Sequence, residues 1–424
     1  MTVRPGLARR PAIRWRGLLC SLAAALAIGL APAVADTPDP PPEVPSPETR
    51  AIEAAFLAGM AEAEAGRCDM AAERFQAILA LDPTLDRVRL ELALCQFRLG
   101  RDDEATANFR EIYHGAVPVE VRQNIRPFLS ALDRRRLFVP TFGLGLAPTT
   151  NANNATTART IRLFGLDFDV APEQRRRSGT GLATQLGGEL RVPVDGNLRL
   201  LLGSGWQHRW YREPSFDDRF LVASIGLAYA DATWDGSVRF LHGERSVGGQ
   251  SVQHQTGGLV DIARAVTPTV SAAAVLQVAQ LTHPERLRGA DGWFAQALVG
   301  PRLTLDHLTQ LQLIGGPIAQ TAQEGFNDLQ GWRGLAVLAT DILPGAELVF
   351  YAGVTTLAAR APDPLFEVRR TGRDLEARLD ATLRQVNVLG FSPTFGATWL
   401  RRSANISVFE TEALEFRAGL RSAY

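Results

Sequence analysis

The sequence has little cysteine, no surplus of charge of either sign, and no long hydrophobic run after Leu30. Lys plus Arg and Asp plus Glu are equal at 45 each, so the net charge favours neither nucleic acid nor another polyanion as a partner. A membrane-spanning helix needs about 20 consecutive apolar residues, and no run beyond Leu30 approaches that length. These absences exclude a nucleic-acid-binding protein and a helical membrane protein.

Motifs that carry catalysis or bind metals are also missing. The six histidines show no HExxH motif and no ligand spacing, and the chain has no CxxC motif, no nucleophile-elbow serine and no glycine-rich phosphate loop. His242 and His254 flank one predicted loop, but two histidines at this spacing make a weak metal site. We therefore expect no enzyme, no cofactor and no metal.

The first 48 residues resemble a leader and a spacer. Five arginines precede an apolar run from Gly17 to Leu30, and the small residues Ala33-Val34-Ala35 follow, which predicts a secretory signal peptide over residues 1–35. Residues 36–48 are rich in proline, which predicts an extended linker.

Residues 49–136 contain an internal repeat. A glycine-arginine pair, an alanine, a phenylalanine and an isoleucine recur at a spacing of 34 residues (66 to 100). The two copies are Gly66-Arg67, Ala71, Phe75 and Ile78, then Gly100-Arg101, Ala105, Phe109 and Ile112. This period resembles the tetratricopeptide repeat, in which paired helices stack around a shared core. Glu62 and Gln96 depart from the pattern, because a large aromatic is usual at both positions.

One face of these repeats has two interpretations. Its residues either form the core of a short array or line a groove for a client protein, with the arginines steering acidic segments. They are Phe56, Met60, Arg87, Leu90, Leu94, Phe97 and Arg98. Cys68 and Cys95 also lie in the repeats. In an oxidising compartment they form either a disulfide or two buried thiols.

From Leu137 the hydrophobic period changes from helical to two. In Ala413–Tyr424 one parity is apolar and the other carries Glu415, Arg417 and Arg421, and residues 374–384 alternate in the same way. A strand with such a dyad fits between lipid and a water-filled lumen. The fold class we predict is α plus transmembrane β: a short helical array, then an antiparallel outer-membrane barrel of about 14 strands over residues 137–424.

The connections alternate in length. Short turns belong on the periplasmic side of such barrels and long loops outside, which predicts a periplasmic repeat domain. The predicted long loops include Asn151–Arg177, Gly243–Ser251 and Arg401–Glu410. The arginine runs at 134–136 and 175–177 would then meet lipid head groups or lipopolysaccharide phosphates, or would simply be solvated.

Barrel closure requires strand one, predicted as Leu137–Leu146, to pair with the last strand. Pro140 lacks a ladder donor, and Gly143, Gly145 and Gly419 contribute no side-chain packing. This seam is either a lateral gate or a site of simple curvature. The terminal Tyr424 resembles the C-terminal signal read by the barrel assembly machinery.

A family resemblance rests on the whole arrangement. A signal peptide, a short repeat domain and the signature containing Pro148, Asn151, Asn153 and Asn154 ahead of the barrel resemble the surface lipoprotein assembly modifiers, or Slam proteins. The resemblance implies a monomeric outer-membrane translocon that delivers client lipoproteins, or related secreted nutrient-acquisition proteins, to the cell surface. The alternatives are an exopolysaccharide export barrel with a repeat scaffold and an outer-membrane hydrolase.

Overall fold

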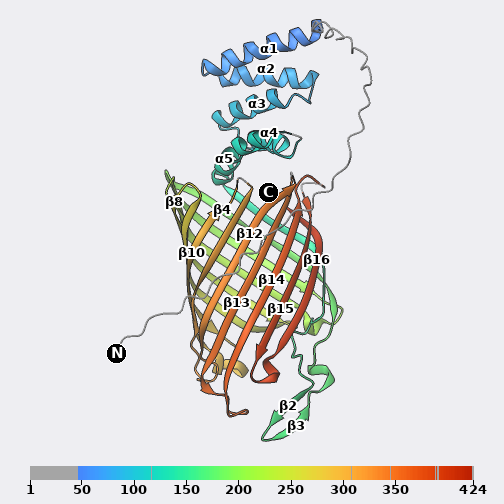
Figure 1. Cartoon of the computed structure of the whole chain (residues 1–424), viewed down its shortest axis with the longest axis vertical. Helices are drawn as coiled ribbons and strands as arrows, with labels where there is room; N and C mark the ends of the chain where they lie inside the picture. The colour runs from blue at the N-terminus through green and yellow to red at the C-terminus, as the bar shows by residue number, and fades with distance from the viewer. Residues whose placement is uncertain are drawn as a thin grey trace, which may run out of the picture. The chain divides into compact units, whose positions relative to one another are not determined.

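The computed structural model describes residues 46–115, 117–306, 308–343, 345–386, 388 and 391–422. Five helices precede a closed antiparallel barrel of 14 strands (Figure 1), which confirms the predicted fold class. From Ile52 onward the chain forms one compact unit. The predicted signal peptide, most of the predicted linker and Tyr424 lie outside the described residues.

The helices fall into pairs that follow the repeat. They are α1 Pro47–Glu64, α2 Cys68–Leu81, α3 Asp86–Arg98, α4 Asp102–His114 and α5 Val119–Arg135. Gly66 and Gly100 follow α1 and α3 with φ of 78° and 72°, a backbone conformation that only glycine adopts readily. The next amides close each helix end, because Arg67 N donates to Glu62 O and Arg101 N to Gln96 O, both at 2.9 Å. The repeated Gly-Arg pair is therefore a helix-ending signal.

The two polar departures from the repeat pattern are both satisfied by hydrogen bonds. Gln96 is 2% exposed, donates to Glu104 at 2.8 Å and accepts from Asn108 at 2.8 Å. Glu62 forms an ion pair with Arg67. Since each polar group has a partner, neither position costs the free energy of an unsatisfied buried group. None of the described helices is long and apolar enough to cross a membrane, a finding that does not bear on strands.

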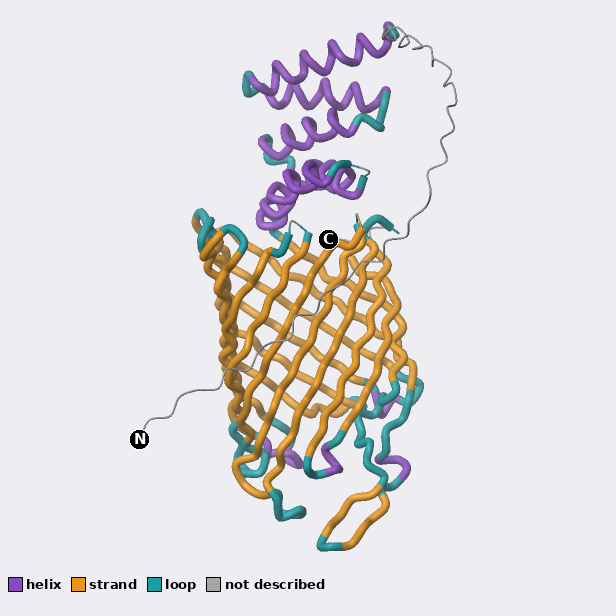
Figure 2. Tube along the Cα trace, viewed as in Figure 1, coloured by secondary structure: helices purple, strands orange, loops and turns teal. Residues whose placement is uncertain are grey.

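The barrel follows a simple up-and-down order in which sequence neighbours pair (Figure 2). Its strands are β1 Phe138–Thr149, β4 Gly179–Asp195, β5 Leu198–Trp210, β6 Asp218–Ala230, β7 Trp234–Val247, β8 Gln250–Thr267, β9 Val270–Thr282, β10 Gly292–Thr304, β11 Thr309–Gln320, β12 Leu329–Leu343, β13 Ala346–Pro362, β14 Arg369–Leu383, β15 Phe391–Ala404 and β16 Thr411–Ser422. β16 returns to pair with β1 and closes the barrel.

Most of the longer connections lie at one end of the barrel, which we call the loop end. The opposite end is the turn end, where the connection between β14 and β15, residues 384–390, is the exception. The first loop carries the separate hairpin of β2 Thr160–Leu163 and β3 Leu166–Asp169, which extends below the barrel in Figure 1. Four connections at this end contain short 3-10 turns, η1 Pro172–Gln174, η2 Pro214–Phe216, η3 Glu285–Ala290 and η4 Ser407–Phe409.

The predicted long loop Gly243–Ser251 is wrong. β7 and β8 continue their pairing to Val247 and Gln250, and only Gly248 and Gly249 form the turn, with φ of 58° and 76°. Two consecutive residues of positive φ make the tight hairpin turn that matches strand twist. The polar composition around the two glycines concealed a strand pair. Strand one is also longer than predicted, since it runs to Thr149.

Candidate functional site

One ion pair identifies the lumen face of the barrel. Arg209 on β5 lies 3.1 Å from Glu415 on β16, across the intervening strands β4 and β1. Side chains of strands so far apart can meet only on the concave side of a closed sheet. Strand register then places Gln185, Arg378, Asp380 and Arg417 on the same inner face.

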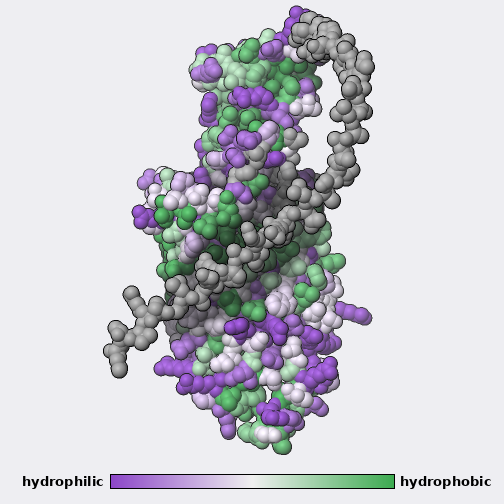
Figure 3. Space-filling model, viewed as in Figure 1, coloured by the Kyte–Doolittle hydropathy of each residue, from purple (hydrophilic) through white to green (hydrophobic). Residues whose placement is uncertain are grey.

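The opposite parity faces outward and is apolar, as the sequence predicts. On β16 it carries Leu414, Phe416, Ala418 and Leu420, and on β14 it carries Leu375, Ala377, Leu379 and Ala381. Figure 3 shows apolar side chains on the visible wall of the barrel and polar ones toward the loop end. An apolar belt on a closed barrel is what lipid requires, because a closed barrel pairs backbone groups between strands and has no open sheet edge.

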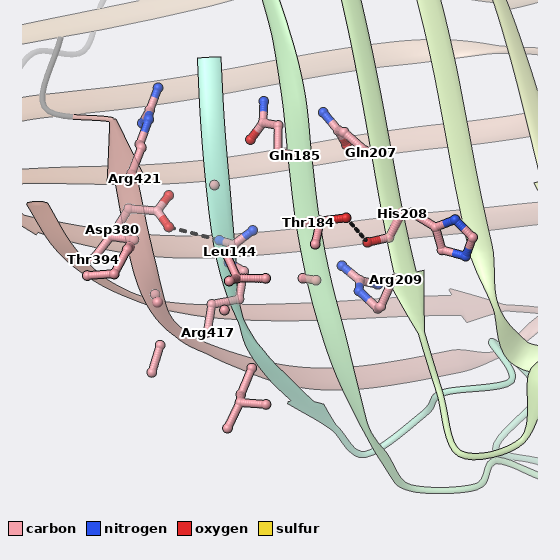
Figure 4. A pocket seen from close by; sticks show the side chains of 18 of the residues that line it. Leu144, Thr184, Gln185, Gln207, His208, Arg209, Asp380, Thr394, Arg417 and Arg421 are labelled. Atoms are coloured by element: carbon pink, nitrogen blue, oxygen red, sulfur yellow. Dashed lines mark hydrogen bonds and ion pairs between the residues drawn. The ribbon is translucent and has the colours of Figure 1, made fainter. Parts of the chain in front are cut away.

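A recess of about 610 Å³ lies in the lumen wall beside the seam between β1 and β16. Gly143, Gly145 and Gly419 form part of its lining. We call this space the seam recess. Because glycine projects no side chain, the wall is hollow here while neighbouring strands carry long polar groups. Figure 4 shows Gln185, Gln207 and Arg209 on one side of β1, Asp380 and Arg421 on the other, and the Arg417 side chain in front of β1.

Arginines outnumber carboxylates around the seam recess. Asp380 serves two arginines, since Arg417 lies 2.8 Å away and Arg378 also pairs with it. Arg245 pairs with Asp218 at 2.8 Å on the far side. Arg421 has no ion pair with any residue that the structure describes. The lumen wall around the seam is thus charged and carries a positive surplus.

β1 has fewer paired residues with β16, across the seam, than with β4 on its other side. β1 pairs with β4 at all twelve positions from Phe138 to Thr149, but with the described part of β16 at five: Gly143, Leu144, Gly145, Leu146 and Thr149. Gly145 faces Gly419 directly, and a Cβ on Gly145 would lie 2.6 Å from the Ala418 carbonyl oxygen. The two glycines therefore permit a close approach of backbones.

The asparagine signature ties the loop end of the seam. Asn151 is 6% exposed and its side-chain amide donates to Ala155 O at 2.9 Å and to Glu412 O at 3.2 Å, while its oxygen accepts from Ala155 N at 3.0 Å. Thr150 adds a reciprocal pair, because its amide donates to Leu414 O and its hydroxyl accepts from Leu414 N, both at 3.0 Å.

The rest of the signature shapes the same loop. Asn153 donates to Arg175 O at 2.8 Å and accepts from Arg177 N at 2.9 Å, which closes the loop on itself. Asn154 has a φ of 48°, a conformation that asparagine tolerates better than most residues. Pro148 lies within β1. The signature residues are thus brought together as a structural clamp from the first loop to β16.

The predicted client-binding face of the repeats lies against two clusters of buried residues: the first core, around Phe75 and Cys95, and the second core, around Phe109 and Ile125. Phe56 and Met60 pack against the first core, and Leu90, Leu94 and Phe97 against the second. Phe97 also meets Phe128 edge-on at 5.2 Å and lies under Arg135. All five are half-buried. Arg87 is exposed and pairs with Glu91 at 2.8 Å, and Arg98 lies 4.0 Å from the Cys68 sulfur.

Cys68 and Cys95 are both free and buried in the first core, so the structure has the thiol form of the two alternatives. Burial, followed by the neighbouring Cys68 thiol, raises the pKa of Cys95 to about 12. The Cys95 thiol therefore stays protonated at physiological pH and is a poor nucleophile.

Hydrogen bonds join the helices to the barrel, among them a weaker one from Arg191 Nη1 on β4 to Asp133 O on α5 at 3.4 Å. The Tyr113 hydroxyl on α4 donates to Asp341 Oδ2 on β12 at 2.6 Å, and Leu308 packs against the same helical core as Tyr113. Burial, and then this hydrogen bond, raise the pKa of Tyr113 above its ordinary value.

His242 and His254 lie on paired strands with ring centroids 6.5 Å apart. His242 bonds Thr256 and His254 bonds Ser251. No group of three or more His, Cys, Asp or Glu residues among those described could hold a metal ion.

Sequence comparison adds an independent observation. Residues 141–305 match the sequence model of the family described as "Surface lipoprotein assembly modifier". The chain is 20% identical over 236 residues to surface lipoprotein assembly modifier 1 of Neisseria meningitidis serogroup B, and 21% identical over 247 residues to surface lipoprotein assembly modifier of Moraxella catarrhalis. The resemblance to the surface lipoprotein assembly modifiers is confirmed.

The alignments cover 55% and 57% of this chain and 47% of each relative, so the chain spans about half the length of these surface lipoprotein assembly modifiers. Residues 2–139 match the model described as "Bacterial transcriptional activator domain", which covers the tetratricopeptide-like helices. Similar solved structures include OmpT of Vibrio cholerae, with a TM-score of 0.35, 8% identity and coverage of 68% of this chain and 98% of that chain. The DcaP channel of Acinetobacter baumannii has a TM-score of 0.37, 11% identity and coverage of 67% and 96%.

The closed barrel with an apolar outer belt and the family match identify an outer-membrane protein. The sequence predicts the seam glycines and the asparagine signature as separate features, and it does not predict that Arg209, Asp380 and Glu412 lie beside them. The alternation of β5 and β14 showed that these charges face the lumen, but no sequence signal pairs Arg209 with Glu415, which lies 206 residues later.

Proposed function

We propose that this protein is an outer-membrane translocon for client lipoproteins or related secreted proteins, with its helical domain in the periplasm. The observation that carries the proposal is the charged seam recess beside a strand pair with five register positions, in a barrel that matches the surface lipoprotein assembly modifier family. A client that must leave the periplasm needs a polar path through the wall, and a recess behind a short seam supplies a polar surface at the point of lowest pairing.

The direct test is co-expression with candidate client lipoproteins in a heterologous Gram-negative host. Clients should become sensitive to external protease only when the protein is present. A client that reaches the surface equally without it would overturn the proposal.

In this proposal the seam is the path. Leu146 and Ala418 lie directly opposite each other on β1 and β16, and opposed residues of antiparallel strands lie within disulfide reach. We expect Leu146→Cys with Ala418→Cys to form a disulfide and stop client export, while the barrel stays folded. The matched control is Ser204→Cys with Ala223→Cys, an opposed outward pair on β5 and β6, which should leave export unchanged. Normal export through the locked seam would assign the path to the lumen.

In the same proposal the helical domain captures the client. Phe97 is a poor test because it packs on Phe128 and a core cluster, so a charge there would disturb folding. Arg87 and Arg98 are exposed, and their replacement by Glu should weaken crosslinking to an acidic client segment. Arg74→Glu changes another exposed helical arginine and is the control. Equal crosslinking in the wild-type protein, the Arg87/Arg98 variant and the control would contradict client binding at this face.

A further inference from the structure

We propose that the seam recess is an oxyanion-binding site, which takes a carboxylate or phosphate group through the guanidinium groups of Arg209, Arg417 and Arg421. The inference concerns binding in the lumen and stands independently of translocation.

Arginines outnumber the carboxylates that pair with them in the seam recess. Its lining contains Arg209, Arg245, Arg378, Arg417 and Arg421. The carboxylates that serve them are Asp218, Asp380 and Glu415. Five guanidinium groups thus share three carboxylates, which leaves a surplus of about two positive charges. A cleft lined by one sign of charge concentrates counter-ions of the opposite sign.

The arginines of the seam recess have N–H donors that their ion pairs do not use. Arg417 uses Nη2 for Asp380 at 2.8 Å, and Arg209 uses Nη2 for Glu415 at 3.1 Å. A guanidinium group has five N–H donors, so both retain donors beyond these pairs. Arg421 forms no ion pair within the part of the chain that is described. Figure 4 places Arg209 on one side of β1 and Arg421 on the other, with the Arg417 side chain in front of β1, so an anion in the seam recess would meet donors from both sides.

Glycines and glutamines complete the lining of the seam recess. Gly143, Gly145 and Gly419 leave the volume of about 610 Å³ between the arginines free of side chains. Gln185 and Gln207 add amide donors to the same lining. Guanidinium groups bind carboxylate and phosphate through paired, charge-assisted hydrogen bonds. This chemistry selects an oxyanion over a cation or an apolar ligand.

Two sources could present the oxyanion, a free inorganic anion or an acidic chain segment. The test is isothermal titration of the full chain in detergent micelles with inorganic phosphate and, separately, with a tetraglutamate peptide. We expect saturable binding of at least one probe, weakened by raising the salt concentration. Phosphate binding identifies a site for free anions, and peptide binding alone identifies a site for carboxylates on a chain.

Arg421→Gln is the first variant, because it removes a cation without breaking a described ion pair. It should weaken binding by about tenfold or more, as expected for loss of one charge-assisted contact. Arg239→Gln is the matched control, since Arg239 faces the lumen but lies outside the seam recess and pairs with Glu189 at 2.8 Å. Heat-modified mobility on gels would report whether each barrel is folded. Absence of saturable binding in the folded wild-type protein, or an equal loss in both variants, would overturn the proposal.

Discussion

At the scale of residues, the hydrogen-bond partners of the asparagine signature give it a structural role. A run of asparagines in a surface loop suggests a flexible or ligand-binding segment, yet Asn151 is 6% exposed and holds backbone groups of its own loop and of β16. Its side chain offers two N–H donors and a carbonyl acceptor, whereas a threonine has one donor and a carboxylate has none. Asparagine at position 151 therefore matches the backbone donor and the two backbone acceptors around it.

Asn151→Ala should loosen the first loop without unfolding the barrel. The substitution removes three hydrogen bonds and leaves buried backbone groups unpaired, at a cost of roughly 1–3 kcal/mol. We expect faster proteolysis within residues 152–178 on the folded protein. The Asn327 side chain bonds Glu324 alone among the described residues, so Asn327→Ala should leave proteolysis there unchanged. Equal cleavage of both variants would contradict the clamp.

The buried thiols make a second prediction at this scale. Because the pKa of Cys95 is raised to about 12 in the folded chain, its thiol contributes stability that is fully present below the unfolded pKa of about 8.5. This stability is lost as the pH rises toward 12. We expect Cys68 and Cys95 to resist maleimide labelling in the native protein at pH 8 and to react after denaturation. Rapid native labelling would show that the first core is open.

At the scale of elements, the seam is uneven along its length. Its loop end has the Asn151 clamp, the Thr150 pair and the ion pair from Arg209 to Glu415. Toward the turn end, β1 before Gly143 has no register partner on the described part of β16. Since separation of two strands must break whatever joins them, we expect any opening to begin at the turn end.

Gly145→Ala and Gly143→Ala form a matched pair on the same strand. A Cβ on Gly145 would lie 2.6 Å from the Ala418 carbonyl oxygen and 2.9 Å from Gly419 Cα, both backbone atoms. A Cβ on Gly143 would meet Gln185 Cβ at 3.5 Å, an ordinary contact. Overpacking of this kind costs about 1–3 kcal/mol, so Gly145→Ala should lower the temperature at which the folded band disappears on gels. Equal heat resistance would show that the backbones can separate without cost.

At the scale of the whole molecule, the helices and the barrel meet through a buried polar contact. Tyr113 is 8% exposed and donates to Asp341 on β12. A charged acceptor makes such a bond stronger than a neutral one. The contact links the helical core to a strand that is far from the seam in the barrel order.

Tyr113→Phe should weaken this link while preserving the packing of the ring. The loss leaves the Asp341 carboxylate without this donor, at a cost of roughly 1–3 kcal/mol. We expect faster amide exchange in α4 and unchanged exchange in the barrel strands. Tyr229→Phe, which removes an exposed bond to Asp231, should alter neither. Unchanged exchange in α4 would show that the Tyr113 hydrogen bond does not hold the helix in place.

Local patterns in the sequence are enough to predict the helices, the strands and the faces of the strands. Period-two alternation on β14 and β16 separates lipid-facing from lumen-facing residues, because successive side chains of a strand point to opposite sides, and the 34-residue repeat (66 to 100) predicts the paired helices. Both signals are local. The tight Gly248-Gly249 turn escaped prediction because composition alone does not report that strand pairing continues.

The contacts at the seam depend instead on how the barrel closes. Barrel closure brings Gly145 against Gly419 and Asn151 against Glu412. It also brings Arg209 across two strands to Glu415. These residues lie more than 200 positions apart in the chain, and no local pattern specifies their register. The recess and its positive surplus follow from that register, because a one-residue slip of β16 would turn Arg417 outward and fill the lumen with leucine.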